Sequence, residues 1–223
     1  MNTLSDAREA NYASGALFAA AQRGQVDRVT ALLAAADTRE ITVQEEMHGA
    51  LCIAIRNDFP AVVRVLCAAD FRLAFRTWDF RFAFPVNEFR ETRRDFQPIH
   101  LAASVGSASC IAELVSRFQV SAGARDGFND TPLHWACRFA HVDAIRKLLA
   151  IKADVDNWND NRDTPLNVCA DYGHIRCVKA LVASQLEEAV LQSAARQQWY
   201  YHQKRCAGLL ARALRLHKAA AAE

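Results

Sequence analysis

The amino-acid sequence predicts an all-α solenoid, a row of short helix pairs, and three observations lead to this fold class. The segment Thr131–His134 (TPLH) recurs as Thr164–Asn167 (TPLN), and Gln97–His100 (QPIH) precedes it by nearly the same interval. A small residue follows each of these starts at one fixed offset, and an apolar stripe at helical spacing comes after it. Such self-similarity is typical of repeat architectures, in which each unit buries its apolar face against its neighbours.

Two further starts, Gly15–Phe18 (GALF) and Gly49–Cys52 (GALC), lack proline but are separated by the same period. The column of small residues consists of Ala20, Ala54, Ala102, Ala136 and Cys169. The apolar stripe falls at offsets of three, six and seven residues, which places it on one face of a helix. We therefore expect a single domain over residues 1–223, with units at about 12–45, 46–93, 94–127, 128–160 and 161–184.

Each unit is expected to hold two short antiparallel helices. Thr131 and Thr164 are suitable N-caps, and the proline after each stands where a missing N–H group costs nothing. Glycine ends the first helix in three units, at Gly24, Gly106 and Gly173. Asp58 and Ala140 hold the same place in the other two units, so we predict a left-handed backbone conformation, or a locally altered helix end, at Ala140.

The segment Asp130–His141 (DTPLHWACRFAH) resembles an ankyrin repeat, and Pro98–Ala103 and Cys169–His174 carry parts of the same motif. The resemblance covers roughly residues 12–184 and implies an all-helical solenoid with short β-hairpins between units. It also implies binding of proteins through the hairpin tips and the exposed side of the first helices, without enzymatic activity. His100 and His134 match the family histidine, which ties the helix start to the hairpin backbone.

The resemblance further assigns contact positions to the hairpin tips and to the ends of the first helices. In the third unit these are Arg93, Arg94, Phe96, Ser104 and Val105; in the fourth, Phe128, Asp130, Arg138 and Phe139; in the fifth, Asp160, Asn161, Asp163, Asp171 and Tyr172. Phe139 and Tyr172 are expected to be exposed on adjacent first helices. Aromatic residues and arginine dominate binding hot spots, so these positions predict a surface for a partner protein, the alternative being ordinary solvated loops.

One interval departs from the repeat. The distance in sequence from Leu66 to Leu114 exceeds that from Leu114 to Leu148, so about fifteen residues are inserted between the second and third units. The affected stretch, 71–96, holds seven phenylalanines, one tryptophan and six arginines. Its alternation of aromatic and other residues predicts an elongated hairpin-like insertion. The expected contact residues are Phe75, Trp78, Phe80, Phe82 and Phe84. The stretch is either a partner-binding finger or a satellite core folded onto the solenoid.

Two other classes of site are alternatives to protein binding. RNA or an acidic ligand is the rival partner, using the insertion's arginines Arg72, Arg76, Arg81, Arg90, Arg93 and Arg94. Four acidic residues dilute the charge of that stretch to +2, which makes nucleic acid an unlikely partner. Cys169, His174 and Cys177 supply only three candidate metal ligands, and their helical columns favour buried thiols. We expect no metal, no cofactor and no catalytic residues.

Composition sets the remaining expectations. The 223 residues are 52% hydrophobic with a formal net charge of +2, which is typical of a folded domain and gives no basic excess for nucleic acid. The charge-free stretch at 10–22 is too short to span a bilayer. Seven cysteines without close pairing suggest free thiols, and hence the cytoplasm or nucleus. Residues 185–218 are expected to form a helical cap, and a monomer is favoured.

Overall fold

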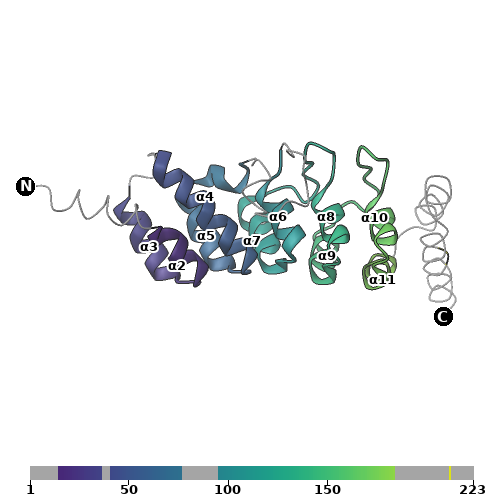
Figure 1. Ribbon diagram of the computed structural model, residues 1–223, viewed down its shortest axis with the longest axis horizontal. Helices are drawn as coiled ribbons and strands as arrows, with labels where there is room; N and C mark the ends of the chain where they lie inside the picture. Colours follow the sequence, from purple (N-terminus) through teal and green to yellow (C-terminus); the bar gives the residue numbers. More distant parts are fainter. Residues whose placement is uncertain (1–14, 37–40, 77–94, 184–210, 212–223) are drawn as a thin grey trace, which may run out of the picture.

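The computed structural model describes residues 15–36, 41–76, 95–183 and 211, and within them the helices form five consecutive pairs (Figure 1). The first helices of the pairs are α2 (Ala16–Gln22), α4 (Ile41–Arg56), α6 (Pro98–Val105), α8 (Pro132–Arg138) and α10 (Pro165–Asp171). The second helices are α3 (Val26–Ala35), α5 (Pro60–Ala69), α7 (Ala108–Phe118), α9 (Val142–Ala150) and α11 (Ile175–Ala183). The all-α repeat fold is therefore confirmed.

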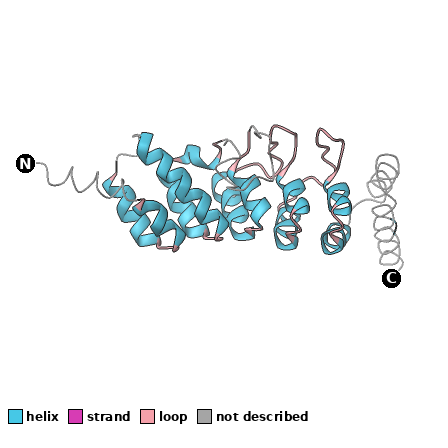
Figure 2. Ribbon diagram, in the orientation of Figure 1, coloured by secondary structure: helices cyan, strands magenta, loops and turns pink. Residues whose placement is uncertain are grey.

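The pairs stack side by side into an elongated, two-layered row with α2 and α11 at opposite ends (Figure 1). Each first helix contacts the next first helix, and each second helix contacts the next second helix. Loops before α8 and α10 project from one side of the row, and Figure 2 shows them as loops, with no strand in the described part of the chain. The projecting elements are thus tight loops rather than paired β-strands.

Leucines of the predicted apolar stripe, one from each second helix, form the interior, and we call them the leucine column. Leu66, Leu114, Leu148 and Leu181 are each 0% exposed. The small-residue column from Ala20 to Cys169 is also buried, because these side chains lie where successive first helices approach one another. Helices of seven residues such as α8 and α10 are too short to be stable alone, so packing between neighbours supplies their stability.

In the third, fourth and fifth units, the residue after the left-handed position that ends the first helix bonds to the preceding unit. Ser107 donates through Oγ to the carbonyl of Ile55. His141 donates through Nε2 to the carbonyl of Ser104 at 2.9 Å, and His174 donates in the same way to the carbonyl of Arg138 at 3.0 Å. These bonds satisfy last-turn carbonyls that have no partner within their own helix.

The predicted start of the insertion hairpin is wrong in the part that the structure describes. Residues Phe71–Ala74 form a 3-10 helix, η1, rather than a strand. Asp70 caps it by accepting a hydrogen bond from the backbone N–H of Arg72 at 3.0 Å. Leu73 and Ala74 are buried together, which a strand of alternating faces would not allow. Residues 77–94 lie outside the described part, so the rest of that prediction remains a prediction.

The left-handed conformation predicted at Ala140 is confirmed, with φ of 62°. Gly106 holds the equivalent place with φ of 83°, and an added Cβ there would lie 2.6 Å from Nδ1 of His141. Glycine is therefore required at 106 by both conformation and space, whereas Ala140 tolerates a strained backbone at an exposed site.

We expect Ala140→Gly to stabilise the protein by up to about 1 kcal/mol, because relief of left-handed strain exceeds the entropy that glycine adds to the unfolded chain. Gly106→Ala is the matched reverse change and should destabilise by more than about 1 kcal/mol, since it adds a steric clash to the strain. Urea denaturation of both variants measures the two effects. A lower midpoint for Ala140→Gly would contradict this account of the helix end.

Candidate functional site

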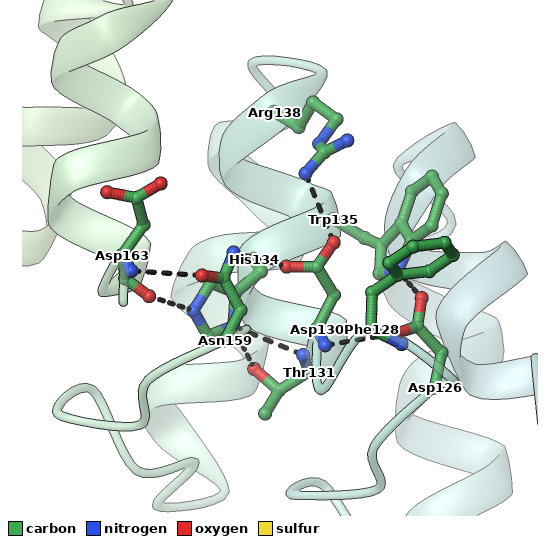
Figure 3. A network of polar contacts seen from close by, with 9 residues as sticks. All are labelled: Asp126, Phe128, Asp130, Thr131, His134, Trp135, Arg138, Asn159 and Asp163. Atoms are coloured by element: carbon green, nitrogen blue, oxygen red, sulfur yellow. Dashed lines mark hydrogen bonds and ion pairs between the residues drawn. The ribbon is translucent and has the colours of Figure 1, made fainter. Parts of the chain in front are cut away.

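The projecting loop before α8 is organised by the buried carboxylate of Asp126 (Figure 3). Its Oδ1 accepts from the backbone N–H groups of Phe128 and Asp130, at 3.0 and 2.9 Å. Its Oδ2 accepts from the indole Nε1 of Trp135 at 3.0 Å. One side chain therefore closes the loop and fastens it to the first helix of the same unit.

Asp130 then joins this loop to the next one. Its Oδ1 accepts from the Asn159 amide at 2.8 Å, and Asn159 in turn accepts from the backbone N–H of Asp163 at 2.9 Å. Its Oδ2 accepts from Nη2 of Arg138 at 3.1 Å, and the Arg138 guanidinium lies 5.4 Å from the Trp135 ring centre. Charge-assisted bonds of this kind, shielded from water, hold the two loops at a fixed spacing.

The two predicted family histidines tie the start of the first helix to the backbone of the loop that follows the unit's second helix, as expected. Nδ1 of His100 accepts from the backbone N–H of Gln97 at 3.0 Å, and its Nε2 lies 3.0 Å from the carbonyl of Ala124. His134 repeats the pattern with Thr131 at 3.1 Å and the carbonyl of Asp163 at 2.9 Å. Because Nε2 faces a carbonyl and Nδ1 faces an N–H group, both rings are neutral with the proton on Nε2.

Burial lowers the pKa of His100 and of His134 below the ordinary 6.5, against opposing attraction from Asp126 and Asp130. A histidine with a lowered folded-state pKa stabilises the protein fully above pH 6.5, and this contribution is lost as pH falls from 6.5 towards the folded-state value. We therefore expect the free energy of unfolding to fall by about 1–3 kcal/mol between pH 7.5 and 5.5.

Urea denaturation across this pH range measures the effect. His134→Asn places there the residue that unit five carries as Asn167, and its pH slope should be shallower than that of the natural protein. Hydrogen bonds from arginines lower the pKa of Asp70 and Glu113, so these groups act below about pH 4. Burial also lowers the pKa of His48 and of His141, so these two histidines add to the slope in the same window. A flat profile between pH 7.5 and 5.5 would refute the assignment.

Direct contacts between the loop tips complete a continuous surface. Asn129 donates to Oδ1 of Asp160 at 2.6 Å, and the backbone N–H of Asp160 donates to the carbonyl of Phe128 at 3.1 Å. Arg125 donates to the carbonyl of Trp158 at 3.1 Å and to Oδ1 of Asn157 at 2.6 Å. The tips of the loops before α8 and α10 therefore form one preorganised face, which we call the loop face, residues 125–130 and 157–163.

Four of the predicted contact residues are not available to a partner, among them Ser104, which is buried on α6. Phe96 is 0% exposed and packs edge-on against Trp135 with ring centres 5.1 Å apart. Asp130 is buried by its bonds to Asn159 and Arg138. The Arg138 side chain is only 12% exposed, because Asp130 and Trp135 hold it. These predictions were wrong about exposure, since the residues stabilise the face rather than present themselves on it.

Other predicted contact residues do lie at the surface. Tyr172 is 55% exposed at the end of α10 and stacks on His174 with ring centres 5.9 Å apart. Phe139 is only half-buried and stacks on Trp135 at 5.9 Å. The remaining predicted residues fall into two groups: Asp160, Asn161 and Asp171 are exposed; Phe128, Asp163 and Val105 are half-buried. Figure 3 shows the Asp163 carboxylate directed away from His134.

Besides the buried Phe96, the insertion contributes one described residue to the predicted set. Phe75 is 36% exposed and packs 5.0 Å from the ring of Phe71, which is 57% exposed. The others lie outside the described residues, namely Trp78, Phe80, Phe82, Phe84, Arg93 and Arg94. Arg72, one of the arginines that an acidic ligand would use, is held by both carboxylate oxygens of Asp70 at 2.9 Å each.

Sequence reasoning missed Trp158, which is 39% exposed on the loop before α10. Its place in the repeat is that of Arg125, one period earlier, and both stand one position before the buried residue that organises the loop. Alternation along the loop could have found it, because Asp126 and Asn159 point inward and their neighbours point outward.

The cysteines show no sign of metal binding in the part of the chain that the structure describes. Six are free thiols, and all but Cys52 are buried. Burial raises the pKa of Cys52 and of Cys67 to about 12, which disfavours the thiolate that a metal needs. Those described ranges also contain no group of three or more histidine, cysteine or acidic side chains placed to hold a metal ion, and no helix with the length and apolarity needed to cross a bilayer.

Comparison with known proteins gives one family model and several relatives that each match part of the chain. Residues 93–194 match the family model described as ankyrin repeats (3 copies). A 32% identical stretch of 84 residues, 38% of this chain, matches target of rapamycin complex 2 subunit AVO2 of Saccharomyces cerevisiae and covers 20% of it. A 34% identical stretch of 74 residues, 33% of this chain, matches a transient receptor potential cation channel subfamily A member 1 homolog of Caenorhabditis elegans and covers 6% of it.

Ankyrin repeat domain-containing protein 37 of Bos taurus is 29% identical over 97 residues, which is 42% of this chain and 58% of that protein. This chain therefore spans less than two thirds of the length of the curated relatives that it matches. Ankyrin repeats generally mediate protein–protein interaction and are generally non-enzymatic. The matched repeats continue the same helix pairing and buried columns that begin at α2, and residues 93–194 of the chain are ankyrin repeats.

Proposed function

We propose that this chain is a protein–protein interaction module, acting as an adaptor, inhibitor or assembly factor, and that it binds its partner through the loop face and the adjoining ends of the first helices. The observation that carries the proposal is the pair of exposed aromatic side chains, Trp158 and Tyr172, on a rigidly bonded frame. Large aromatic groups held in place lose little entropy on binding, which makes them effective anchors.

The root of the insertion extends the proposed surface. Phe71 and Phe75 form an exposed aromatic pair beside the end of α7, where Phe118 lies 6.2 Å from Phe71. Exposed apolar groups that cluster in this way mark interaction sites more often than isolated ones do. This supports the finger interpretation for Phe71 and Phe75, whereas Leu73, Ala74 and Phe96 of the same stretch are buried, as a satellite core would have them.

Protein binding is favoured over catalysis because the buried histidines already serve as structural hydrogen-bonding groups. Both ring nitrogens of His100 and of His134 are engaged with backbone groups, so neither ring offers a nitrogen for proton transfer to a substrate. We further propose a monomer that resides in the cytoplasm or nucleus, a proposal supported by the six free thiols.

Affinity purification with quantitative mass spectrometry tests the proposal. The natural chain and the double variant Trp158→Ala/Tyr172→Ala are used as baits in the same extract. We expect proteins enriched by the natural chain to be reduced at least about tenfold with the double variant, because each anchor contributes about 1–2 kcal/mol. Phe18→Ala is the matched control, since Phe18 is a similarly exposed aromatic residue (41%) on α2, outside the proposed surface. Equal enrichment by all three baits would overturn the proposal.

A further inference from the structure

A second candidate surface lies between α9 and α11, on the side of the row away from the projecting loops (Figure 1). An open groove runs between these two helices. Its lining combines apolar groups, among them Leu149, Ala150 and Ala180, with the cationic groups Arg146, Arg176 and Lys179. The loop face carries four aspartates, two of them buried, and two arginines, so the two surfaces differ in position and in net charge.

The cations of this groove are not neutralised by acidic side chains in the described residues. Arg146 approaches only Asp143, at 3.4 Å, and the two side chains are 68% and 84% exposed, which makes the pair weak. Arg176 and Lys179 form no ion pair within the described ranges, and α11 contains no acidic residue. The groove therefore presents positive charge beside apolar surface.

The adjacent second helices α5 and α7 show one way in which this repeat fills the place. Nε and Nη2 of Arg64 on α5 donate to the two carboxylate oxygens of Glu113 on α7, at 2.7 and 3.0 Å. Arg117 adds a third contact to Glu113 at 3.1 Å. A carboxylate here satisfies the cations and lies over the junction between the two helices.

The buried leucine column relates this pair to the groove residue by residue. Arg64 and Arg146 each stand two positions before a column leucine, Leu66 and Leu148. Glu113 and Ala180 each stand one position before the next, Leu114 and Leu181. Ala180 therefore occupies the position facing Arg146 that Glu113 occupies facing Arg64, and the carboxylate is missing between α9 and α11.

We propose that the groove between α9 and α11 binds an acidic amphipathic helix of a partner protein, whose carboxylates take the place that Glu113 takes beside Arg64. The apolar face of that helix packs on Leu149, and the small side chains of Ala150 and Ala180 allow its backbone a close approach. Both α9 and α11 are nine residues long, about 13 Å, which accommodates two to three turns of a bound helix. This surface is separate from the loop face and does not depend on it.

The groove suits a carboxylate-bearing helix better than a phosphate group. A phosphate site needs several donors that converge on one point in a partly dehydrated pocket. Here Arg146 is 68% exposed, and the cations are spread along an open, largely apolar groove. Spread charges flanking apolar surface match a helix with glutamates on both sides of a leucine stripe.

A labelled synthetic peptide tests the proposal on the full chain. The probe is a helical peptide of about 16 residues, with leucine at every third or fourth position and glutamate on both flanks. Its twin carries glutamine in place of glutamate. We expect fluorescence anisotropy to show binding of the glutamate peptide, binding of the glutamine peptide weaker by at least about tenfold, and an affinity that falls with added salt.

Ala180→Glu supplies the missing carboxylate from within the chain and should weaken binding at least about tenfold, whereas Arg146→Gln should weaken it by removing the cation itself. Ala31→Glu is the matched control, because Ala31 is exposed one position before the column residue Leu32 on α3, far from the groove. It should leave binding unchanged. Trp158→Ala should also leave it unchanged, which separates this proposal from the proposed function of the loop face. Thermal unfolding confirms that each variant is folded.

Several results would overturn the proposal. These are no binding of the glutamate peptide, equal binding of its glutamine twin, or full binding by the folded Ala180→Glu variant. Two parallel measurements test other occupants of the groove. Groove-dependent binding to phosphatidylserine vesicles in place of the peptide would assign the surface to a membrane. Self-association that Ala180→Glu abolishes, measured by sedimentation, would assign it to a second copy of the chain.

Discussion

Asp126→Ala is expected to lower the free energy of unfolding by about 3–5 kcal/mol, because three donors lose their acceptor at once. The donors are the backbone N–H groups of Phe128 and Asp130 and the indole N–H of Trp135. Asp126 is only 4% exposed, so water cannot readily replace the carboxylate. Chemical denaturation measures the loss.

Two variants separate the parts of this effect. Asp126→Asn imitates Asn159, the equivalent residue of the next unit, and should cost only about 1–2 kcal/mol because it keeps an acceptor for the backbone donors. Asp154→Ala removes an exposed aspartate that caps a similar two-residue turn through the backbone N–H of Asp156, and should cost less than about 1 kcal/mol. Equal losses for Asp126→Ala and Asp154→Ala would contradict the role of the buried network.

Leu148→Ala is expected to cost about 2–5 kcal/mol, the sum of lost apolar burial and a residual cavity. Leu148 is 0% exposed and lies on α9, which packs between the second helices α7 and α11. Each unit contacts only its neighbours, so damage at this central position should also broaden or split the unfolding transition. Calorimetry and denaturation followed by circular dichroism measure both effects.

Leu149→Ala, the adjacent change in the same helix, serves as the control. Leu149 is only half-buried, so the loss should be less than half of that for Leu148→Ala. A loss below about 1 kcal/mol for Leu148→Ala would mean that the leucine column does not form the interior.

The repeat period predicted the fold because every unit must bury the same helix faces against its neighbours, so the same residue types recur at the same positions. The leucine column, the small-residue column and the left-handed position at Ala140 each recur at one offset, and all were found where that offset places them. The histidine bridges followed from the family resemblance and were also found. Repetition averages out the ambiguity that a single helix pattern carries.

The exposure of individual site residues could not be predicted in the same way. Asp130 and Arg138 are polar and lie near loop tips, yet a network spanning two units buries them. Phe96 fills space beside Trp135, a contact between residues that lie far apart in the sequence. Period-two alternation misled at 71–76 because Asp70 offers a capping carboxylate, and a local hydrogen bond then decides between strand and 3-10 helix.

The bonds made by Ser107, His141 and His174 have a mechanical consequence. When the two ends of the row are pulled apart, the junctions between units carry the load in series, and the weakest junction yields first. The corresponding place at the first junction holds Phe59, whose ring rests against Gly24 without a hydrogen bond of its own, beside an exposed bond from Asn57 to Gln22. The first junction therefore resists tension through packing, including the broad contact between α2 and α4, whereas the next three junctions must also break less exposed side-chain hydrogen bonds.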